Sequence, residues 1–236
     1  MTLSWQGMVG GALAAGIGAL IAIAGMGGFS GGQSGGDAIR TYLLAHPEII
    51  PEAMNRLADK QTAQAIEANR AAITTPFPGA VAGNPHGRVT LTEYYDYACV
   101  YCRASVGDIE KLIAADPDLR VVYKELPILA PESDGAARMS LAAAGEGKFL
   151  PFHRAMYEGG ALDAAKVAQT AKQFGVNPAA ADTSAIAREI ETNLQTARAL
   201  GIQGTPTFIV GDQLLSGAVG YGALKAAIDK ARATES

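Results

Sequence analysis

The chain has few cysteines, few histidines and no excess of positive charge. Its 236 residues include 2 cysteines and 3 histidines, and 19 lysines and arginines stand against 23 acidic residues, for a formal net charge of -4. Nucleic-acid binding depends on a basic surface, so this balance argues against that class of function. A closed structural zinc site needs four ligands, and no histidine lies at ligand spacing from the cysteines. We therefore expect neither a metal nor another cofactor.

The N-terminal part lacks ionisable side chains altogether. None precedes Asp37, and the 23 residues from Gly7 to Phe29 are apolar or glycine. A helix that rises about 1.5 Å per residue crosses a hydrocarbon core of about 30 Å in roughly 20 residues, so a membrane segment is predicted. It is either a retained anchor or a cleaved signal, because Ala22 to Ala24 fits a small-x-small cleavage site. We favour the retained anchor.

A helical extension is predicted after the membrane segment. Residues 27–36 are rich in glycine and serine, which is typical of a flexible tether. Asp37 is expected to cap a first helix, and Pro47 to open a second one that reaches about Ile73. The second helix has a narrow apolar stripe that thins to alanine, which either packs on its own domain or associates with other copies of the chain. We predict self-association through residues 37–75.

The remainder of the chain predicts a small mixed sheet with helices on both faces. Residues 74–87 are rich in proline and glycine without periodicity, and are interpreted as a linker. The order after them is strand, helix, strand, four helices, strand, strand and helix. The expected ranges are about 88–97, 99–115, 119–129, 133–200 for the four helices, 206–211, 213–217 and 221–232. The helices at 133–200 would form an insertion between the two halves of an α/β sheet.

Both cysteines, Cys99 and Cys102, lie where a predicted strand meets a predicted helix, with Val100 and Tyr101 between them. A disulfide across so short a loop adds little stability, so a redox role is favoured over a structural bridge. Unpaired N–H groups and the helix dipole favour a thiolate at Cys99, and in such sites the pKa of the first cysteine falls from about 8.5 to roughly 3.5–7. We predict that Cys99 is the exposed attacking sulfur and that the less exposed Cys102 resolves the mixed disulfide.

Three stretches carry a resemblance to a known family, namely "GNPHGRVTLTEYYDYACVYCR", "VYKELPIL" and "GIQGTPTFIVG". They resemble the DsbA-like thiol-disulfide oxidoreductases of the thioredoxin superfamily. The stretch "IRTYLLAHPEIIPEAMNRL" resembles the N-terminal helices of the branch that includes the suppressor-of-copper-sensitivity protein C. The resemblance runs from about Asp37 to the C-terminus. It implies a thioredoxin fold in residues 84–236, with the helical insertion at about 133–200, after the extension at 37–75.

The resemblance also assigns roles to residues outside the cysteine pair. Pro206 matches a proline that is cis in the family and faces the active-site sulfurs, and Thr205 before it would present its backbone to an extended substrate. Val100 and Tyr101 are expected to contact the substrate as well. Glu93 matches the family's buried acid, which relays a proton to or from the second cysteine. Without the resemblance, Glu93 is interpreted as a solvent-facing strand residue.

The chain departs from the family between the cysteines. The branch usually has Pro-Tyr there and the strong oxidants have Pro-His, whereas this chain has Val100 and Tyr101. Without an imidazolium beside Cys99, we expect intermediate oxidising power. His153, in the predicted insertion, is interpreted as a packed or surface residue and not as a ligand.

The sequence therefore predicts a thiol-disulfide oxidoreductase, either an oxidase or an isomerase, that acts on cysteine-containing proteins. It would need a redox partner to reset the cysteine pair. The predicted location is the bacterial periplasm, with the N-terminal segment tethering the protein to the inner membrane. The alternative is a copper-binding dithiol protein of the cell envelope, in which two thiolates hold Cu(I), consistent with the copper link of the resembled branch.

Overall fold

The computed structural model describes residues 34–234, and the chain divides into two units, Met1–Ala53 and Met54–Ser236. The predicted membrane segment, residues 7–29, lies outside the described residues, as does most of the predicted tether. Within residues 34–234, no helix combines the length and the apolar character that a membrane crossing needs. The described part of the chain therefore does not test the anchor prediction.

Helix α1 spans Ser34–Ala45 and helix α2 spans Ile49–Ala68. Helix α1 begins three residues before the predicted start at Asp37, so the end of the predicted tether is helical. Large apolar side chains are exposed along both helices, at Ile39, Tyr42, Leu44, Ile50, Met54 and Leu57. Exposed apolar side chains gathered on helices are typical of a surface that packs against a partner.

The predicted second helix breaks at Asn69 and does not run on to Ile73. Asn69 leaves helical geometry, with φ -114° and ψ 9°, and its side-chain amide donates a 2.8 Å hydrogen bond to the carbonyl of Ala65. Asparagine competes with the helix in this way because its side chain bonds nearby backbone groups. A short helix α3, Arg70–Thr74, follows the break.

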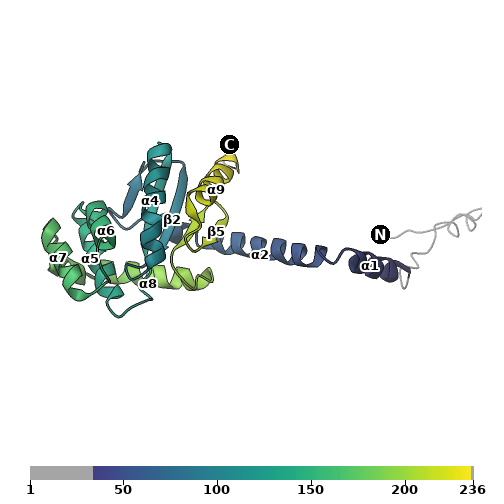
Figure 1. The fold of residues 1–236 in the computed structure, drawn as a ribbon, viewed down its shortest axis with the longest axis horizontal. Helices are drawn as coiled ribbons and strands as arrows, with labels where there is room; N and C mark the ends of the chain where they lie inside the picture. The colour runs from purple at the N-terminus through teal and green to yellow at the C-terminus, as the bar shows by residue number, and fades with distance from the viewer. Residues whose placement is uncertain (1–33, 235–236) are drawn as a thin grey trace, which may run out of the picture. The chain divides into compact units, whose positions relative to one another are not determined.

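A five-stranded mixed sheet forms the centre of the second unit (Figure 1), with strand order β1-β3-β2-β4-β5. The strands are β1, Val81–Gly83; β2, Val89–Tyr95; β3, Leu119–Glu125; β4, Thr207–Val210; and β5, Gln213–Ser216. Strands β2 and β3 run parallel, and the other neighbours run antiparallel. Strand β1 lies inside the segment that was interpreted as a linker, so that interpretation is wrong there. A strand of three residues is too short to show an alternating pattern.

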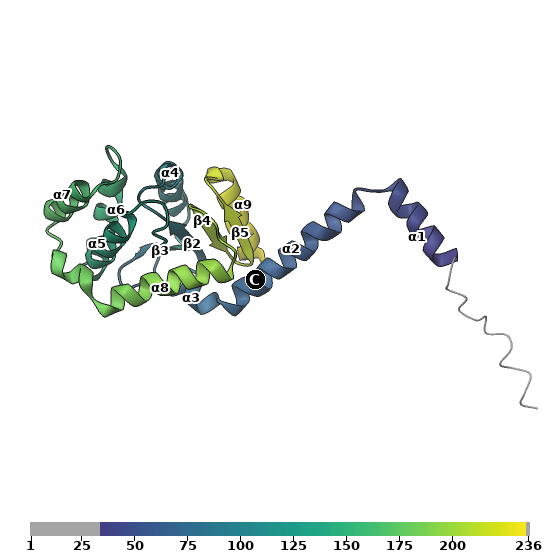
Figure 2. The ribbon, with the colours of Figure 1, turned by 90° about the horizontal axis from the view of Figure 1, so that it is seen from below.

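The remaining helices follow the predicted order. They are α4, Val100–Ala115; α5, Ser133–Gly145; α6, Phe149–Tyr157; α7, Ala164–Phe174; α8, Ser184–Ala199; and α9, Gly220–Thr234, with an unpredicted 3-10 helix η1 at Pro178–Asp182. Helices α4 and α9 lie on one side of the sheet, and α3 and α8 on the other (Figure 2). This is a thioredoxin-like α/β fold with a helical insertion.

The central strand β2 is buried on both faces. Leu91 and Tyr95 belong to the larger core, which includes residues of α4 and α9, whereas Tyr94 packs with Ile66 and Ile209 in a second core on the opposite face. Successive side chains of a strand point to opposite faces, and here each face meets helices. From Leu91 to Tyr95, the side chains of β2 are therefore buried on either face, the polar ones included.

Three loops meet at the carboxyl end of β2. The parallel pairing sets Tyr95 opposite Glu125, so β2 and β3 end side by side. Strand β4 runs the other way and begins there, with Thr207 opposite Tyr94. The residues that follow β2, follow β3 and precede β4 consequently lie along one edge of the sheet.

Candidate active site

The two cysteines lie where β2 ends and α4 begins. Cys99 is the N-cap residue of α4, and its sulfur accepts a 3.3 Å hydrogen bond from the backbone N–H of Cys102. Both cysteines are free thiols. The N–H groups of the first helical turn have no partner within the helix, so they are available to a negatively charged sulfur at this position. The local geometry predicted from the sequence is therefore present.

The sulfur predicted to be exposed is nearly covered. Cys99 is 5% exposed and Cys102 is 0% exposed, whereas Val100 and Tyr101 are 63% and 64% exposed. The order of exposure of the two cysteines is as predicted, but Cys99 is far less open than expected. The residues that present themselves to a partner are the two between the cysteines.

The third of the converging loops brings Thr205 to Cys99. The Cys99 thiol donates to the carbonyl oxygen of Thr205 at 3.1 Å, across 106 residues of sequence. The peptide bond from Thr205 to Pro206 is cis, as the resemblance implies, and Pro206 is buried. The structure thus places Thr205, Pro206 and the cysteine pair together.

The two sulfurs differ in acidity. The pKa of Cys99 is lowered to about 5, chiefly by its hydrogen bond with the Cys102 side chain and further by backbone N–H groups, although burial opposes this effect. Burial raises the pKa of Cys102 well above its usual value, and the hydrogen bond to Cys99 and the charge of Glu93 add to the increase. At neutral pH the reduced pair therefore carries its negative charge on Cys99.

Glu93 lies inside the protein, as the resemblance implies, and the interpretation as a solvent-facing residue, made without the resemblance, is wrong. It is 2% exposed, because it lies on the central strand between β3 and β4. Burial raises the pKa of Glu93 to about 8, and the charge of the Cys99 thiolate contributes to the rise. A carboxylic acid that titrates near neutral pH is suited to move a proton.

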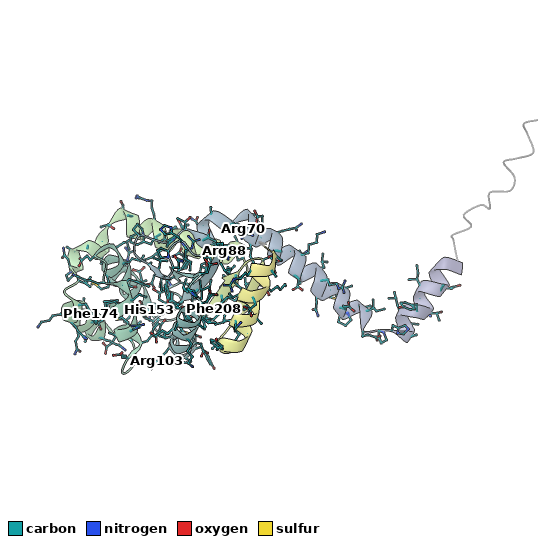
Figure 3. All side chains as sticks on the ribbon, turned by 90° about the horizontal axis from the view of Figure 1, so that it is seen from above. Arg70, Arg88, Arg103, His153, Phe174 and Phe208 are labelled. Atoms are coloured by element: carbon teal, nitrogen blue, oxygen red, sulfur yellow. The ribbon has the colours of Figure 1, made fainter. Side chains whose placement is uncertain are left out.

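His153 is packed in the core, which is one of the two placements predicted for it. It is 2% exposed, its Nδ1 lies 3.0 Å from the hydroxyl of Tyr97, and Figure 3 places it among the packed side chains of the second unit. Burial lowers the pKa of His153 to about 3, so its ring is neutral at physiological pH. Its ring packs edge-on against Tyr95 and Tyr157.

Two buried acids near the site were not predicted from the sequence. The hydroxyl of Tyr95 donates a short hydrogen bond to Glu125, and burial raises the pKa of Glu125 well above its usual range. Asp96, which follows β2 directly, is 1% exposed and accepts hydrogen bonds through both carboxylate oxygens. The available signal was an acidic residue at the end of a predicted strand, in both "TEYYD" and "VVYKE".

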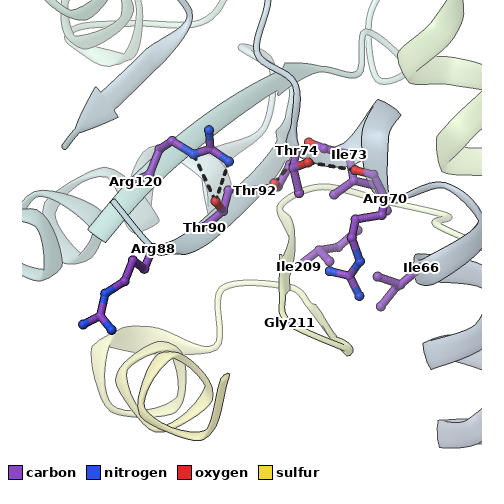
Figure 4. Close-up of a pocket in the computed structure, with 10 residues that line it drawn as sticks. All are labelled: Ile66, Arg70, Ile73, Thr74, Arg88, Thr90, Thr92, Arg120, Ile209 and Gly211. Atoms are coloured by element: carbon purple, nitrogen blue, oxygen red, sulfur yellow. Dashed lines mark hydrogen bonds between the residues drawn. The ribbon is translucent and has the colours of Figure 1, made fainter. Parts of the chain in front are cut away.

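A separate cavity of about 170 Å³ lies on the opposite face of the sheet (Figure 4). Arg70, Arg88 and Arg120 line it together with Thr90 and Thr92. Each guanidinium group already bonds a carboxylate or a hydroxyl oxygen. Successive side chains of a strand point to opposite faces, so Thr90 and Thr92 project from the face of β2 opposite to that of Glu93, away from the cysteines. The cavity is not part of the dithiol site.

The described residues offer few ligands for a metal ion. Within residues 34–234 there is no group of three or more histidine, cysteine, aspartate or glutamate side chains that is placed to hold one. A Cu(I) ion at the pair would have sulfur ligands from Cys99 and Cys102. It would then occupy the sulfur that the geometry activates for exchange.

Two family models match the chain. Residues 90–229 match the DSBA-like thioredoxin domain, and residues 36–64 match the copper resistance protein ScsC N-terminal domain. The first match contains the cysteine pair, Glu93 and the Thr205 to Pro206 bond. The second covers most of the described part of the helical extension.

Solved structures of oxidoreductases have the same fold. A thioredoxin-like oxidoreductase from Silicibacter pomeroyi is 37% identical with a TM-score of 0.67, over 70% of this chain and 98% of that chain. A linker-deletion mutant of Proteus mirabilis ScsC is 27% identical with a TM-score of 0.70, over 83% and 92%. The thiol-disulfide exchange protein α-DsbA2 from Wolbachia pipientis is 27% identical with a TM-score of 0.65, over 73% and 96%.

The curated relatives that match are longer proteins. A Na(+)/H(+) antiporter NhaA from Herminiimonas arsenicoxydans is 32% identical over 158 residues, which is 64% of this chain and 25% of the antiporter. The chain thus spans about a quarter of the length of that relative.

We expect the alkylation of reduced Cys99 by iodoacetamide to show a pH midpoint near 5. Only the thiolate reacts, so the rate should be level well above the pKa of about 5 and should fall about tenfold per pH unit below it. Mass spectrometry of the modified peptide measures the rate for each cysteine. In concentrated urea the midpoint should move to about 8.5. A midpoint near 8.5 in the folded chain would contradict the assignment.

The substitution Glu93→Gln should stabilise the reduced chain at high pH. The folded-state pKa of Glu93, about 8, lies above the usual value of 4.5, so the folded form binds the proton more tightly than the unfolded form. The stability that protonated Glu93 contributes to the folded chain is therefore fully present below pH 4.5 and is lost as the pH rises through about 8. Glutamine carries no charge, so urea unfolding should show a gain on the order of 2–4 kcal/mol above pH 8 and little difference below pH 4.5. An equal gain in stability at both pH values would show that the raised pKa of Glu93 is not the cause.

Proposed function

Since the chain belongs to the family of DSBA-like thioredoxin domains and is a thiol-disulfide oxidoreductase, we propose that Cys99 exchanges disulfides with cysteine-containing client proteins. The difference in acidity between the two sulfurs supports this role most directly. Cys99 has a pKa of about 5 at the start of a helix, whereas Cys102 is buried behind it with a raised pKa. A sulfur that is anionic at neutral pH attacks readily and leaves readily.

The proposed oxidation of a client proceeds in two exchanges. A client thiolate attacks the Cys99 sulfur of the oxidised pair, which breaks the bond to Cys102 and forms a mixed disulfide. The Cys102 sulfur leaves with the electron pair and takes up a proton. The second client thiolate then attacks the client sulfur of the mixed disulfide, and Cys99 leaves as a thiolate. The client loses two electrons and the pair gains them.

Glu93 is proposed to supply the proton that Cys102 takes up. It is buried in the same core as the pair, and its charge raises the pKa of Cys102. With a pKa of about 8, Glu93 is mostly protonated at neutral pH and can donate to the leaving sulfur. In the reverse direction it would accept the proton, so one residue serves oxidation and reduction.

The contacts around Cys99 suggest how a client docks. The backbone of Thr205, which lies against the Cys99 sulfur, is placed to pair with an extended client segment. Pro206 keeps that position of the backbone free of an N–H donor. The exposed side chains of Val100 and Tyr101 would add apolar contact with residues that flank the client cysteine.

The proposed setting is the bacterial periplasm, with residues 7–29 holding the protein at the inner membrane. The length and apolar character of that run support the anchor. Extraction of cell membranes with alkaline carbonate tests this, because it releases proteins that are not embedded. A redox partner that resets the pair completes the cycle.

Residues 37–75 are proposed to join copies of the chain. The exposed apolar side chains of α1 and α2 support this, together with the match of residues 36–64 to the ScsC N-terminal domain. Ordered helices lose about 1–2 kcal/mol of backbone entropy per residue, which exposed apolar faces do not offset until they are covered. An assembly with several cysteine pairs around a shared space would favour isomerisation of misfolded clients.

The substitution Cys102→Ala should trap client proteins on Cys99. Without the resolving thiol, the mixed disulfide can be released only by an outside thiol. Non-reducing gels of cells that produce the variant should show high-mass complexes that disappear on reduction. The matched variant Cys99→Ala should show none, and trapping by Cys99→Ala alone would reverse the two roles.

The paired substitution of Leu44→Asp and Met54→Asp should reduce the mass of the assembly to that of one chain. Both side chains are exposed, at 65% and 66%, so the charges are tolerated in a single chain but not in an apolar interface. Light scattering at micromolar concentration measures the mass. If the unsubstituted chain is itself a monomer, self-association through residues 37–75 is wrong.

A further inference from the structure

The exposed large apolar side chains of residues 58–234 fall in two short segments. They are Val100 and Tyr101 between the cysteines, and Ile128 and Leu129, which are 42% and 50% exposed, in the loop between β3 and α5. Strands β2 and β3 are parallel and end side by side, so both pairs leave the sheet at the same edge. These four residues are here called the apolar rim: two lie between the cysteines, and two lie in the loop that hydrogen-bonds Asp96, three residues before Cys99. Apolar side chains gathered in this way typically mark an interaction surface.

Asp96 holds the outer half of the apolar rim. Its Oδ2 accepts hydrogen bonds from the backbone N–H groups of Ile128, at 2.8 Å, and Leu129, at 2.9 Å. Its Oδ1 accepts from the N–H of Ala98, at 2.8 Å, and from the hydroxyl of Ser133, at 2.7 Å. The side chain is buried, and four donors from three segments of the chain converge on it.

Among the described residues, the backbone N–H groups of residues 127–131 find their acceptors in Asp96 and Ser133. Residues 127–131 contain two prolines, which have no N–H, so the loop has three backbone donors. Asp96 accepts two of them, and the hydroxyl of Ser133 accepts the third, from Ala130, at 3.2 Å. Ser133 in turn donates to Asp96, so every N–H of the loop depends on this carboxylate directly or through one hydroxyl.

The same residue also shapes the turn that carries Cys99. The backbone carbonyl of Asp96 accepts from the N–H of Cys99 at 3.0 Å and from the hydroxyl of Tyr157 at 3.1 Å. With its side-chain bond to Ala98, these contacts define the turn between β2 and α4. Asp96 thus fixes the position of the loop at 127–131 relative to the reactive sulfur.

We propose that Asp96 is a positioning residue, which holds Ile128 and Leu129 beside Cys99 so that the apolar rim binds an extended client segment with apolar residues next to its cysteine. This inference rests on the proposed function and names its client class. The rim has no charged side chain, so its contacts are apolar. Unfolded proteins are the clients that display such segments, because folded proteins bury most of their large apolar side chains.

The substitution Asp96→Asn tests the proposal. It keeps the size of the side chain but replaces one accepting oxygen with an N–H₂ group, which only donates, so in either orientation of the amide two of the four converging donors lose their acceptor. The reaction to follow is reduction of the oxidised full chain by three reductants. These are a two-cysteine peptide with leucines beside its cysteines, the same peptide with serines instead, and glutathione. For the variant we expect the KM of the leucine peptide to rise and its kcat/KM to fall about fivefold or more, because half of the hydrogen bonds that hold the loop, directly or through Ser133, are lost. The kcat/KM values of the serine peptide and of glutathione report on the thiol chemistry without apolar contact, and they should fall by a smaller factor than that of the leucine peptide.

A matched control is Asp116→Asn. Asp116 likewise accepts a backbone N–H within a loop, that of Asp118 at 3.1 Å, but it lies before the start of β3, at the far end of the strand. It should leave the preference for the leucine peptide unchanged. If Asp96→Asn does not fold, Ser133→Ala removes one of the four bonds and should weaken the same preference by a smaller factor.

Equal loss with all three reductants would overturn the inference, because Asp96 would then act on the thiol chemistry and not on client binding. An unchanged preference in the folded variant, or in Ser133→Ala where that variant replaces it, would overturn it as well. An unsubstituted chain that reacts with glutathione but does not prefer the leucine peptide defeats this inference alone. An unsubstituted chain whose oxidised pair reacts with none of the reductants defeats the proposed function.

Discussion

The hydrogen bonding of Cys102 to the Cys99 sulfur, by its side chain and by its backbone N–H, is the interaction on which the chemistry of the site depends. It exists because α4 begins at Cys99, so the free donors of the first turn meet the sulfur. The same helical turn carries Cys102 into the core, where it loses contact with water. One short helix start therefore makes one sulfur acidic and the other resistant to ionisation, which is the difference that ordered disulfide exchange requires.

Burial of polar groups is the second constraint, and the chain meets it in two ways. Asp96 is compensated by four hydrogen bonds, which makes its burial tolerable and ties the loop after β3 to the site. The cost of burying the Glu93 carboxylate is offset far less, and its pKa is therefore raised to about 8. The first acid is suited to hold a structure and the second to carry a proton, although both lie on or just after the same strand.

The direction of β3 makes these arrangements possible. Because β2 and β3 are parallel, their following loops emerge together, and because β4 is antiparallel, Thr205 arrives at the same edge from the opposite direction. Cys99, the carbonyl of Thr205 and the apolar loop at 127–131 are thereby brought to one edge of the sheet from parts of the chain that are distant in sequence. Helices on both faces of the sheet keep water from the acids beneath them (Figure 2).

The sequence by itself determined the features that depend on near neighbours. The alternation of β2, the periodicity of α4 and the position of the cysteines between them were all readable, because each involves a few consecutive residues. The cis bond before Pro206 came only from the family resemblance. The burial of Glu93 likewise came from the resemblance, against the interpretation of the strand by itself. Tertiary structure alone decided that Val81–Gly83 pairs with β3 and that Asp96 binds the loop at 127–131. Each of these depends on partners about 30 or more residues away, and a local pattern contains no information on which distant groups will cover or bond a side chain.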